Sequence, residues 1–187
     1  MLTSKEEVVA ATRAWLETEV IGLNLCPFAK AVHSAGQIRY FVSDAETAEA
    51  LRADVVSELK FLSGVDAAEV DTTRLIHPKV FDDFLDFNDF LTEAEAAIKE
   101  LDFVGVFQVA SFHPRYQFAG TRPGDVENRT NRSPYPTLHL LREESVERAV
   151  EGYPGASEIP QRNIETMRRL YSSRGGPPKG GTEPASG

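Results

Sequence analysis

Cysteine is the scarcest nucleophilic residue in this chain of 187 residues, which contains only Cys26. One cysteine cannot form a disulfide bond within the chain. The sequence also lacks an uninterrupted apolar run of about 18 residues, so no segment is predicted to span a membrane. Charged side chains interrupt the place where a secretion signal would be apolar. These absences predict a soluble, cytoplasmic protein with no membrane partner.

Basic residues are fewer than acidic ones: 20 lysines and arginines against 29 aspartates and glutamates give a net charge of -9. Such a charge repels phosphate backbones, so we expect no nucleic acid partner. The sequence contains no glycine-rich phosphate loop, no Gly-x-Ser-x-Gly turn and no His-Glu-x-x-His motif, which removes several common enzyme classes. No cofactor is predicted.

The order of the predicted elements indicates the fold class. Strands are predicted at 38–43, 72–78, 104–114 and 137–142, with helices between and around them, including a long helix at 81–101. This alternation favours an α/β fold with a four-stranded, mostly parallel or mixed sheet flanked by helices. The fourth strand is free to run antiparallel, because no helical crossover precedes it. A ferredoxin-like α+β sandwich is the alternative.

Length and composition bound the domain organisation. A chain of this size with 41% hydrophobic residues can bury one substantial core, and we expect a single globular domain over residues 1–172. Residues 173–187 are rich in Gly, Pro and Ser and are predicted to be a disordered tail. The sequence does not determine the oligomeric state.

Two histidines, His77 and His113, are candidate catalytic residues because each ends a predicted strand and is followed by proline. Ligands of open parallel sheets collect beyond the carboxyl ends of the strands. If the second and third strands are neighbours, both imidazoles lie at the same edge of the sheet. The alternative is that each His-Pro pair only terminates a strand.

Cys26 is the third candidate catalytic residue. Pro27 is suited to the first position of a short helix, which makes Cys26 the predicted N-cap, where free backbone donors favour a thiolate. The alternative is a small buried hydrophobic residue. Cys26 with His113 and Asn131 would match the logic of nucleophile, base and orienting group. Cys26, His77 and His113 could also bind zinc, but their spacing matches no compact metal motif, and no metal site is predicted.

The segment 114–136 is longer than usual loops and contains four arginines in an acidic protein. Guanidinium groups beside amide and hydroxyl donors suit a carboxylate or phosphate ligand. The candidate substrate-binding residues are Arg115, Arg129, Asn131, Arg132 and Tyr135. The alternative is that the arginines pair with nearby carboxylates and hold the loop against the body of the protein.

Four segments, "GLNLCPFAKAV", "RLIHPKVFDDFLDFNDFL", "QVASFHPRYQFAGT" and "NRTNRSPYPTLHLLRE", resemble the bacterial family called domain of unknown function 1415. The resemblance covers roughly residues 4–171. It implies a small soluble protein of a family without an assigned activity, so it carries no catalytic role onto any residue.

Two functional hypotheses remain open. The first is an enzyme that acts on a small anionic metabolite through a thiol or histidine site at the carboxyl ends of the strands. The second is a noncatalytic module that binds a ligand or a protein through the arginine-rich loop. The distance between Cys26 and His113 distinguishes them, because catalysis by both requires hydrogen-bond reach or one bridging water.

Overall fold

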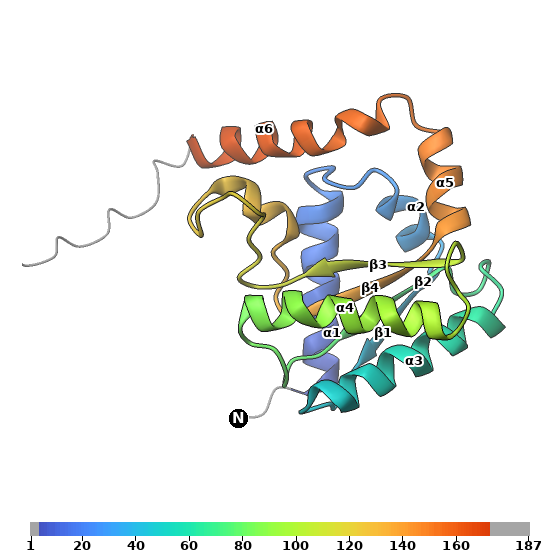
Figure 1. Cartoon of the computed structure of the whole chain (residues 1–187). Helices are drawn as coiled ribbons and strands as arrows, with labels where there is room; N and C mark the ends of the chain where they lie inside the picture. The colour runs from blue at the N-terminus through green and yellow to red at the C-terminus, as the bar shows by residue number, and fades with distance from the viewer. Residues whose placement is uncertain (1–3, 173–187) are drawn as a thin grey trace, which may run out of the picture.

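A computed structural model describes residues 4–172 (Figure 1). Its four strands are β1 (Ile38–Val42), β2 (Thr72–Ile76), β3 (Phe107–Phe112) and β4 (Thr137–Arg142), and they form one sheet in the order β1-β2-β4-β3. β1 and β2 are parallel, whereas β4 runs antiparallel to both of its neighbours. The predicted α/β fold with a four-stranded sheet flanked by helices is confirmed. The sheet is mixed rather than mostly parallel, and β4 takes the antiparallel course that the lack of a helical crossover left open.

The helices account for much of the rest of the described chain. The α-helices are α1 (Lys5–Trp15), α2 (Ala29–Ser34), α3 (Ala48–Gly64), α4 (Phe84–Glu100), α5 (Glu143–Glu151) and α6 (Ile159–Ser172). A π-helical segment, η1 (Leu16–Ile21), continues α1, and two 3-10 helices are η2 (Val126–Asn131) and η3 (Ala156–Glu158). Between residues 4 and 172, no helix is long and apolar enough to cross a membrane. The tail predicted at 173–187 lies outside the described residues.

The main core lies between the sheet and helices α3 and α4. Leucines such as Leu75, Leu138 and Leu140 point to this face and are fully buried with the apolar faces of both helices. Because side chains alternate along a strand, Arg74 and His139 point to the opposite face. That face is covered by α1 and η1 and bordered by α2, α5 and α6 (Figure 1). Helices on both faces rule out the ferredoxin-like alternative.

Capping residues mark the starts of α1 and α3. Ser4 caps α1, in a capping box with Glu7. Thr47 caps α3, and Ser43 extends β1 through a bond from its N–H to the carbonyl of Ile76 (2.8 Å). Helix α2 begins at Ala29 rather than at Pro27 as predicted, because the backbone first makes a turn, and Cys26 lies in that turn.

Candidate functional site

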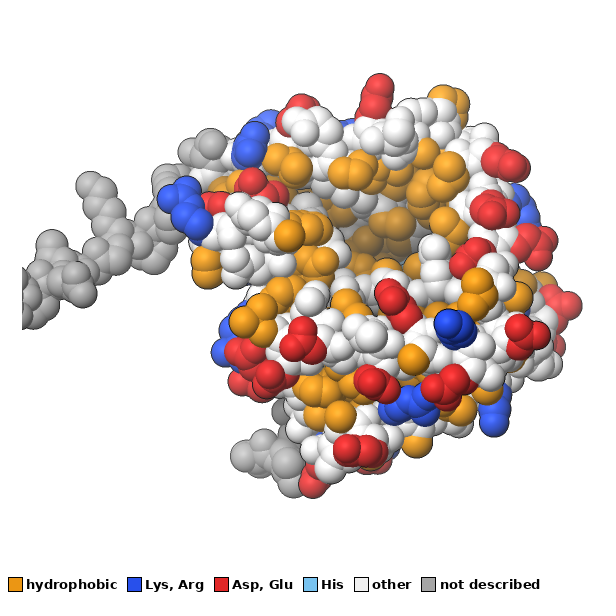
Figure 2. All heavy atoms as spheres, viewed as in Figure 1, with side chains coloured by type: hydrophobic (Ala, Val, Ile, Leu, Met, Phe, Trp, Pro, Cys, Tyr) orange, Lys and Arg blue, Asp and Glu red, His pale blue; other side chains and the backbone are white. Residues whose placement is uncertain are grey.

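A chamber of about 620 Å³ lies on the sheet face opposite α3 and α4. Strands β2, β3 and β4 supply its floor, and α2, α5, α6 and the end of η2 supply its walls. Figure 2 shows this chamber as a hollow lined mainly by hydrophobic side chains. Its size lies within the range of small-molecule pockets, about 300–1,000 Å³. The apolar lining includes Leu25, Phe28, Val32, Ile38, Ala110, Phe112 and Leu141.

Contacts between distant segments close the chamber wall. Phe28 packs edge-on against Tyr153, with ring centroids 5.7 Å apart, and so joins the turn before α2 to the connection between α5 and α6. Asn163 in α6 donates a hydrogen bond to the carbonyl of Leu25 at 2.8 Å. The C-terminal helices are therefore fixed over the sheet at the same turn that carries Cys26.

Arg74 is the most unusual residue of the chamber floor. Only 2% of it is exposed, and its Nε and Nη1 atoms have no hydrogen-bond partner among the described residues. Two other arginines line the chamber but are engaged: Arg142 donates to three carbonyls, and Arg148 pairs with a glutamate at 2.8 Å. Within residues 4–172, Arg74 forms no ion pair with a carboxylate.

The surroundings of Arg74 keep it charged but poorly solvated. The rings of Trp15 and Phe112 lie 5.5 and 5.6 Å from its guanidinium carbon, which gives weak cation–π contacts. Burial lowers the pKa of Arg74 to about 10, and the acidic groups of Tyr40 and Cys26 oppose this shift. The guanidinium therefore remains protonated at neutral pH, inside an apolar chamber. Buried charges are normally paired, so the guanidinium of Arg74 would be stabilised by a bound anion.

His139 lies beside Arg74 in the sheet, as its register partner on β4. The residue is half-buried, and its buried Nε2 atom has no hydrogen-bond partner among the described residues. Burial, together with the charge of Arg74, holds the pKa of His139 well below its usual value. The imidazole is therefore neutral and can donate or accept one hydrogen bond at the chamber floor.

Cys26 lines the same chamber from the turn that precedes α2. The predicted N-cap position is wrong, because Phe28 occupies it and no side chain caps the helix. The Cys26 carbonyl instead accepts a bond from the N–H of Ala29 at 3.2 Å, which closes the turn. The half-buried thiol packs against an apolar cluster that contains Trp15 and Val20. Its nearby positive charge is thus Arg74 rather than a helix terminus.

His77 and His113 lie together, but on the other face of the sheet. Each ring packs against Phe87 of α4, with centroids 5.3 Å apart in both cases. This proximity arises although β4 separates β2 from β3. His77 donates from Nδ1 to the carbonyl of Val80 at 3.1 Å, and His113 donates from Nε2 to the carbonyl of Phe81 at 3.0 Å. The two histidines therefore brace the turn that leads into α4.

The structure does not bring Cys26 and His113 together, because the sheet lies between them. The sheet also separates Cys26 from His77, so the three candidate zinc ligands do not meet at one site. In the part of the chain that the structure describes, no group of three or more His, Cys, Asp or Glu side chains is placed to hold a metal ion. Asn131, by contrast, lines the same chamber as Cys26.

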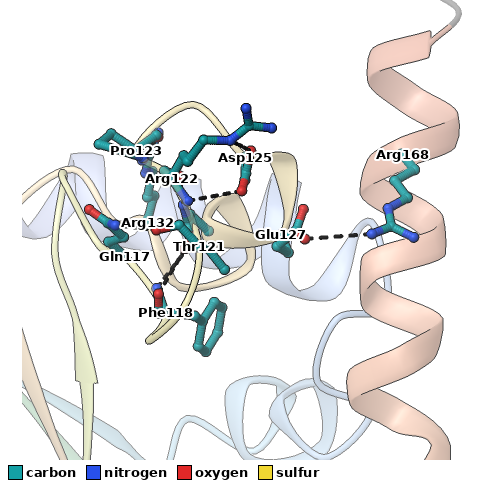
Figure 3. Close-up of polar contacts among 10 residues, drawn as sticks. Gln117, Phe118, Thr121, Arg122, Pro123, Asp125, Glu127, Arg132 and Arg168 are labelled. Atoms are coloured by element: carbon teal, nitrogen blue, oxygen red, sulfur yellow. Dashed lines mark hydrogen bonds and ion pairs between the residues drawn. The ribbon is translucent and has the colours of Figure 1, made fainter.

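The loop at 114–136 is ordered by its own polar contacts. The buried amide of Asn128 accepts from the N–H of Phe118 and from the hydroxyl of Thr121, both at 2.9 Å, and donates to the carbonyl of Arg122 at 2.8 Å. Figure 3 shows this loop beside α6, where Glu127 pairs with Arg168 at 3.5 Å. The loop is therefore a fixed part of the fold.

The loop arginines and Tyr135 do not line the chamber. Arg115 pairs with Asp82 at 2.9 Å, while Arg129 lies over the ring of Tyr171 and donates to its hydroxyl at 2.8 Å. The carbonyl of Tyr135 accepts bonds from Ser133 and Thr137. These contacts match the alternative in which the loop is held by its own arginines.

Arg132 gives a test of that structural role. It donates to the carbonyls of Tyr116 at 3.2 Å and Pro123 at 2.7 Å. We expect Arg132→Ala to lower the free energy of unfolding in urea by about 1 to 2 kcal/mol, because two charge-assisted bonds are lost. Arg122→Ala is the control and should change it by less than about 0.5 kcal/mol, since that side chain is 89% exposed. Equal values for both variants would contradict this role.

The sequence did not single out Arg74 or His139 as candidate site residues. The available signal was an arginine inside the short apolar strand segment "TTRLI", with polar partners at the facing position of "TLHLL". A charged residue in a strand buried on both faces requires a specific partner. Which face holds a cavity, however, depends on the packing of helices far away in the sequence.

Comparison with known families gives one match. The model of a family described as "Protein of unknown function (DUF1415)" matches residues 7–175. No curated protein and no solved structure matches the chain.

Proposed function

The chain belongs to the DUF1415 family, and we propose that it binds a small organic anion in the chamber above its sheet. The observation that carries this proposal is the buried, unpaired guanidinium of Arg74 on the chamber floor. A carboxylate is the simplest ligand group that can supply charged acceptor oxygens to the unpaired donors Nε and Nη1, and such charge-assisted hydrogen bonds are strong. The adjacent neutral His139 supplies a further hydrogen bond.

The chamber walls define the rest of the ligand. Most of the lining is apolar, and the other charged groups at its border already have partners. A ligand with a single anionic group and an apolar body matches this distribution better than a sugar phosphate or a polyanion. We therefore propose a monocarboxylate with an aliphatic or aromatic body of modest size.

The proposed anion site is at Arg74 and not at the loop arginines that the sequence suggested. Arg115, Arg129 and Arg132 are held by carboxylates, aromatic rings or backbone carbonyls, and none borders the chamber. Asn131 is the one predicted substrate-binding residue at the chamber wall, where its amide already donates to the carbonyl of Ser111 at 3.3 Å. The small anionic ligand is therefore held mainly by Arg74 at the chamber floor, and not by the arginines of the loop at 114–136.

A thermal-shift experiment with matched ligands tests this proposal. We expect hexanoate and phenylacetate to raise the melting temperature, and hexanamide, which lacks the charge, to have no effect. At a hundredfold excess over the dissociation constant, binding adds about 2.7 kcal/mol to stability, or roughly 5 to 11 °C for a domain of this size. Equal shifts with the acid and the amide, or no shift with any carboxylate, would refute the anion site.

A further inference from the structure

Cys26 and Arg74 border one chamber, although they come from segments that are far apart in the sequence. Tyr40 and Cys26 are acidic groups that raise the pKa of Arg74 against the effect of burial. Of these two, Cys26 borders the cavity and Tyr40 does not. The thiol therefore lies where a ligand held by Arg74 would extend its body.

We infer that Cys26 is the nucleophile of this chamber and attacks an electrophilic carbon of an organic anion whose carboxylate is bound by Arg74. This inference rests on the proposed function, since it needs the anion to be held there. The substrate class is a small carboxylic acid that carries a leaving group on a carbon near the carboxylate. Arg74 fixes the acid end, and the apolar wall around Leu25 and Val32 fixes the body.

The chemistry of this step is a substitution at carbon. The sulfur of Cys26 supplies the electron pair for a new S–C bond, and the bond from that carbon to the leaving group breaks with its electron pair. The proton of the thiol passes to solvent or to the departing group. The positive charge of Arg74 neutralises the carboxylate of the bound substrate and so holds its reacting carbon inside the chamber that Cys26 borders. No oxidant, metal or cofactor is needed to balance the reaction.

The position of Cys26 fits this role better than that of a core residue. Its side chain is half-buried and borders a cavity, whereas the fully buried Leu16 of the same apolar cluster does not border it. Arg74 is itself almost entirely buried, and its unpartnered nitrogens lie at the floor of the same cavity. These observations are independent: one places a thiol at the border of the chamber, and the other places an unpaired cation at its floor.

Iodoacetate and iodoacetamide are matched probes for this inference. Both alkylate thiols with loss of iodide, but only iodoacetate carries a carboxylate. Alkylation rates would be measured by intact mass, with glutathione as the free-thiol reference. We expect the iodoacetate-to-iodoacetamide rate ratio of Cys26 to exceed that of glutathione by about tenfold or more, as one charge-assisted bond would give. Arg74→Met should return the ratio to the glutathione value.

Hexanoate protection keeps the test independent of the folding of the Arg74 variant. In the native protein, hexanoate should slow alkylation by iodoacetate, and Cys26→Ala should keep the full thermal shift with hexanoate. A hexanoate shift without preferential alkylation of Cys26 would overturn this inference and leave the anion site in place. The absence of both effects would overturn both proposals.

Discussion

Replacing Arg74 with methionine is expected to stabilise the ligand-free protein by about 1 to 3 kcal/mol, because an uncompensated buried cation is exchanged for an apolar side chain of similar shape. The two cation–π contacts to Trp15 and Phe112 offset only part of the desolvation cost. The same variant should lose its thermal response to hexanoate. Urea unfolding with and without the ligand measures both effects.

Arg39 provides the matched control, since it lies in the neighbouring strand β1 on the opposite face of the sheet. Its guanidinium forms two bonds to Glu58, at 2.7 and 3.1 Å, and the carboxylate is only 3% exposed. Arg39→Met should therefore destabilise the protein by about 3 kcal/mol, because it leaves a buried carboxylate without its partner. If Arg74→Met costs a similar amount, Arg74 serves the fold rather than a ligand.

If Arg74→Met raises the free energy of unfolding and Arg39→Met lowers it, Arg39 serves the fold and Arg74 serves a ligand. Natural proteins retain locally unfavourable groups mainly where function requires them. The stability gained on removing Arg74 is then the free energy that the ligand-free protein gives up to keep a preformed anion site. A bound carboxylate recovers it by supplying the missing charge.

The fold was largely predictable because its signals are local. The segment 137–142 was predicted as a strand with the bounds that β4 has, and the long helix predicted at 81–101 corresponds to α4. Short apolar runs, turn residues and helical spacing determine these elements within a window of about ten residues. The antiparallel course of β4 followed from the lack of a helical crossover before it.

The site was less predictable because it depends on pairing order and on distant packing. Placing His77 and His113 in a shared ligand site assumed that β2 and β3 are neighbours, yet β4 is inserted between them. The two rings still meet, but through Phe87 and on the face filled by α3 and α4. Nothing in the local sequence indicates that the cavity lies on the face that carries Arg74.

The loop arginines illustrate a second limit. Their density in an acidic chain suggested a ligand, but backbone carbonyls and aromatic rings satisfy several of them. Such partners leave no charge pattern in the sequence. Comparing the number of arginines with the number of nearby carboxylates therefore overestimates the need for a bound anion. A single arginine in a buried strand indicates an anion site more directly.

The buried histidines make stability depend on pH. Burial, opposed by the bond to Val80, lowers the pKa of His77 to about 4, and burial also lowers the pKa of His113 and of His139. As the pH falls below about 6.5, these histidines bind protons in the unfolded chain but stay neutral in the folded protein. The free energy of unfolding therefore falls. His77 alone should contribute a loss of about 2 kcal/mol between pH 8 and pH 5.

Urea unfolding of His77→Asn across the same range tests the assignment. The asparagine amide can keep the bond to the carbonyl of Val80 but does not titrate, so the loss between pH 8 and pH 5 should shrink by about 2 kcal/mol whatever the variant's stability at pH 8. Ordinary carboxylates stay mostly ionised above pH 5 and contribute little there. An unchanged loss in the variant would mean that His77 is protonated in the folded protein, and His113 and His139 would then have to account for the acid sensitivity.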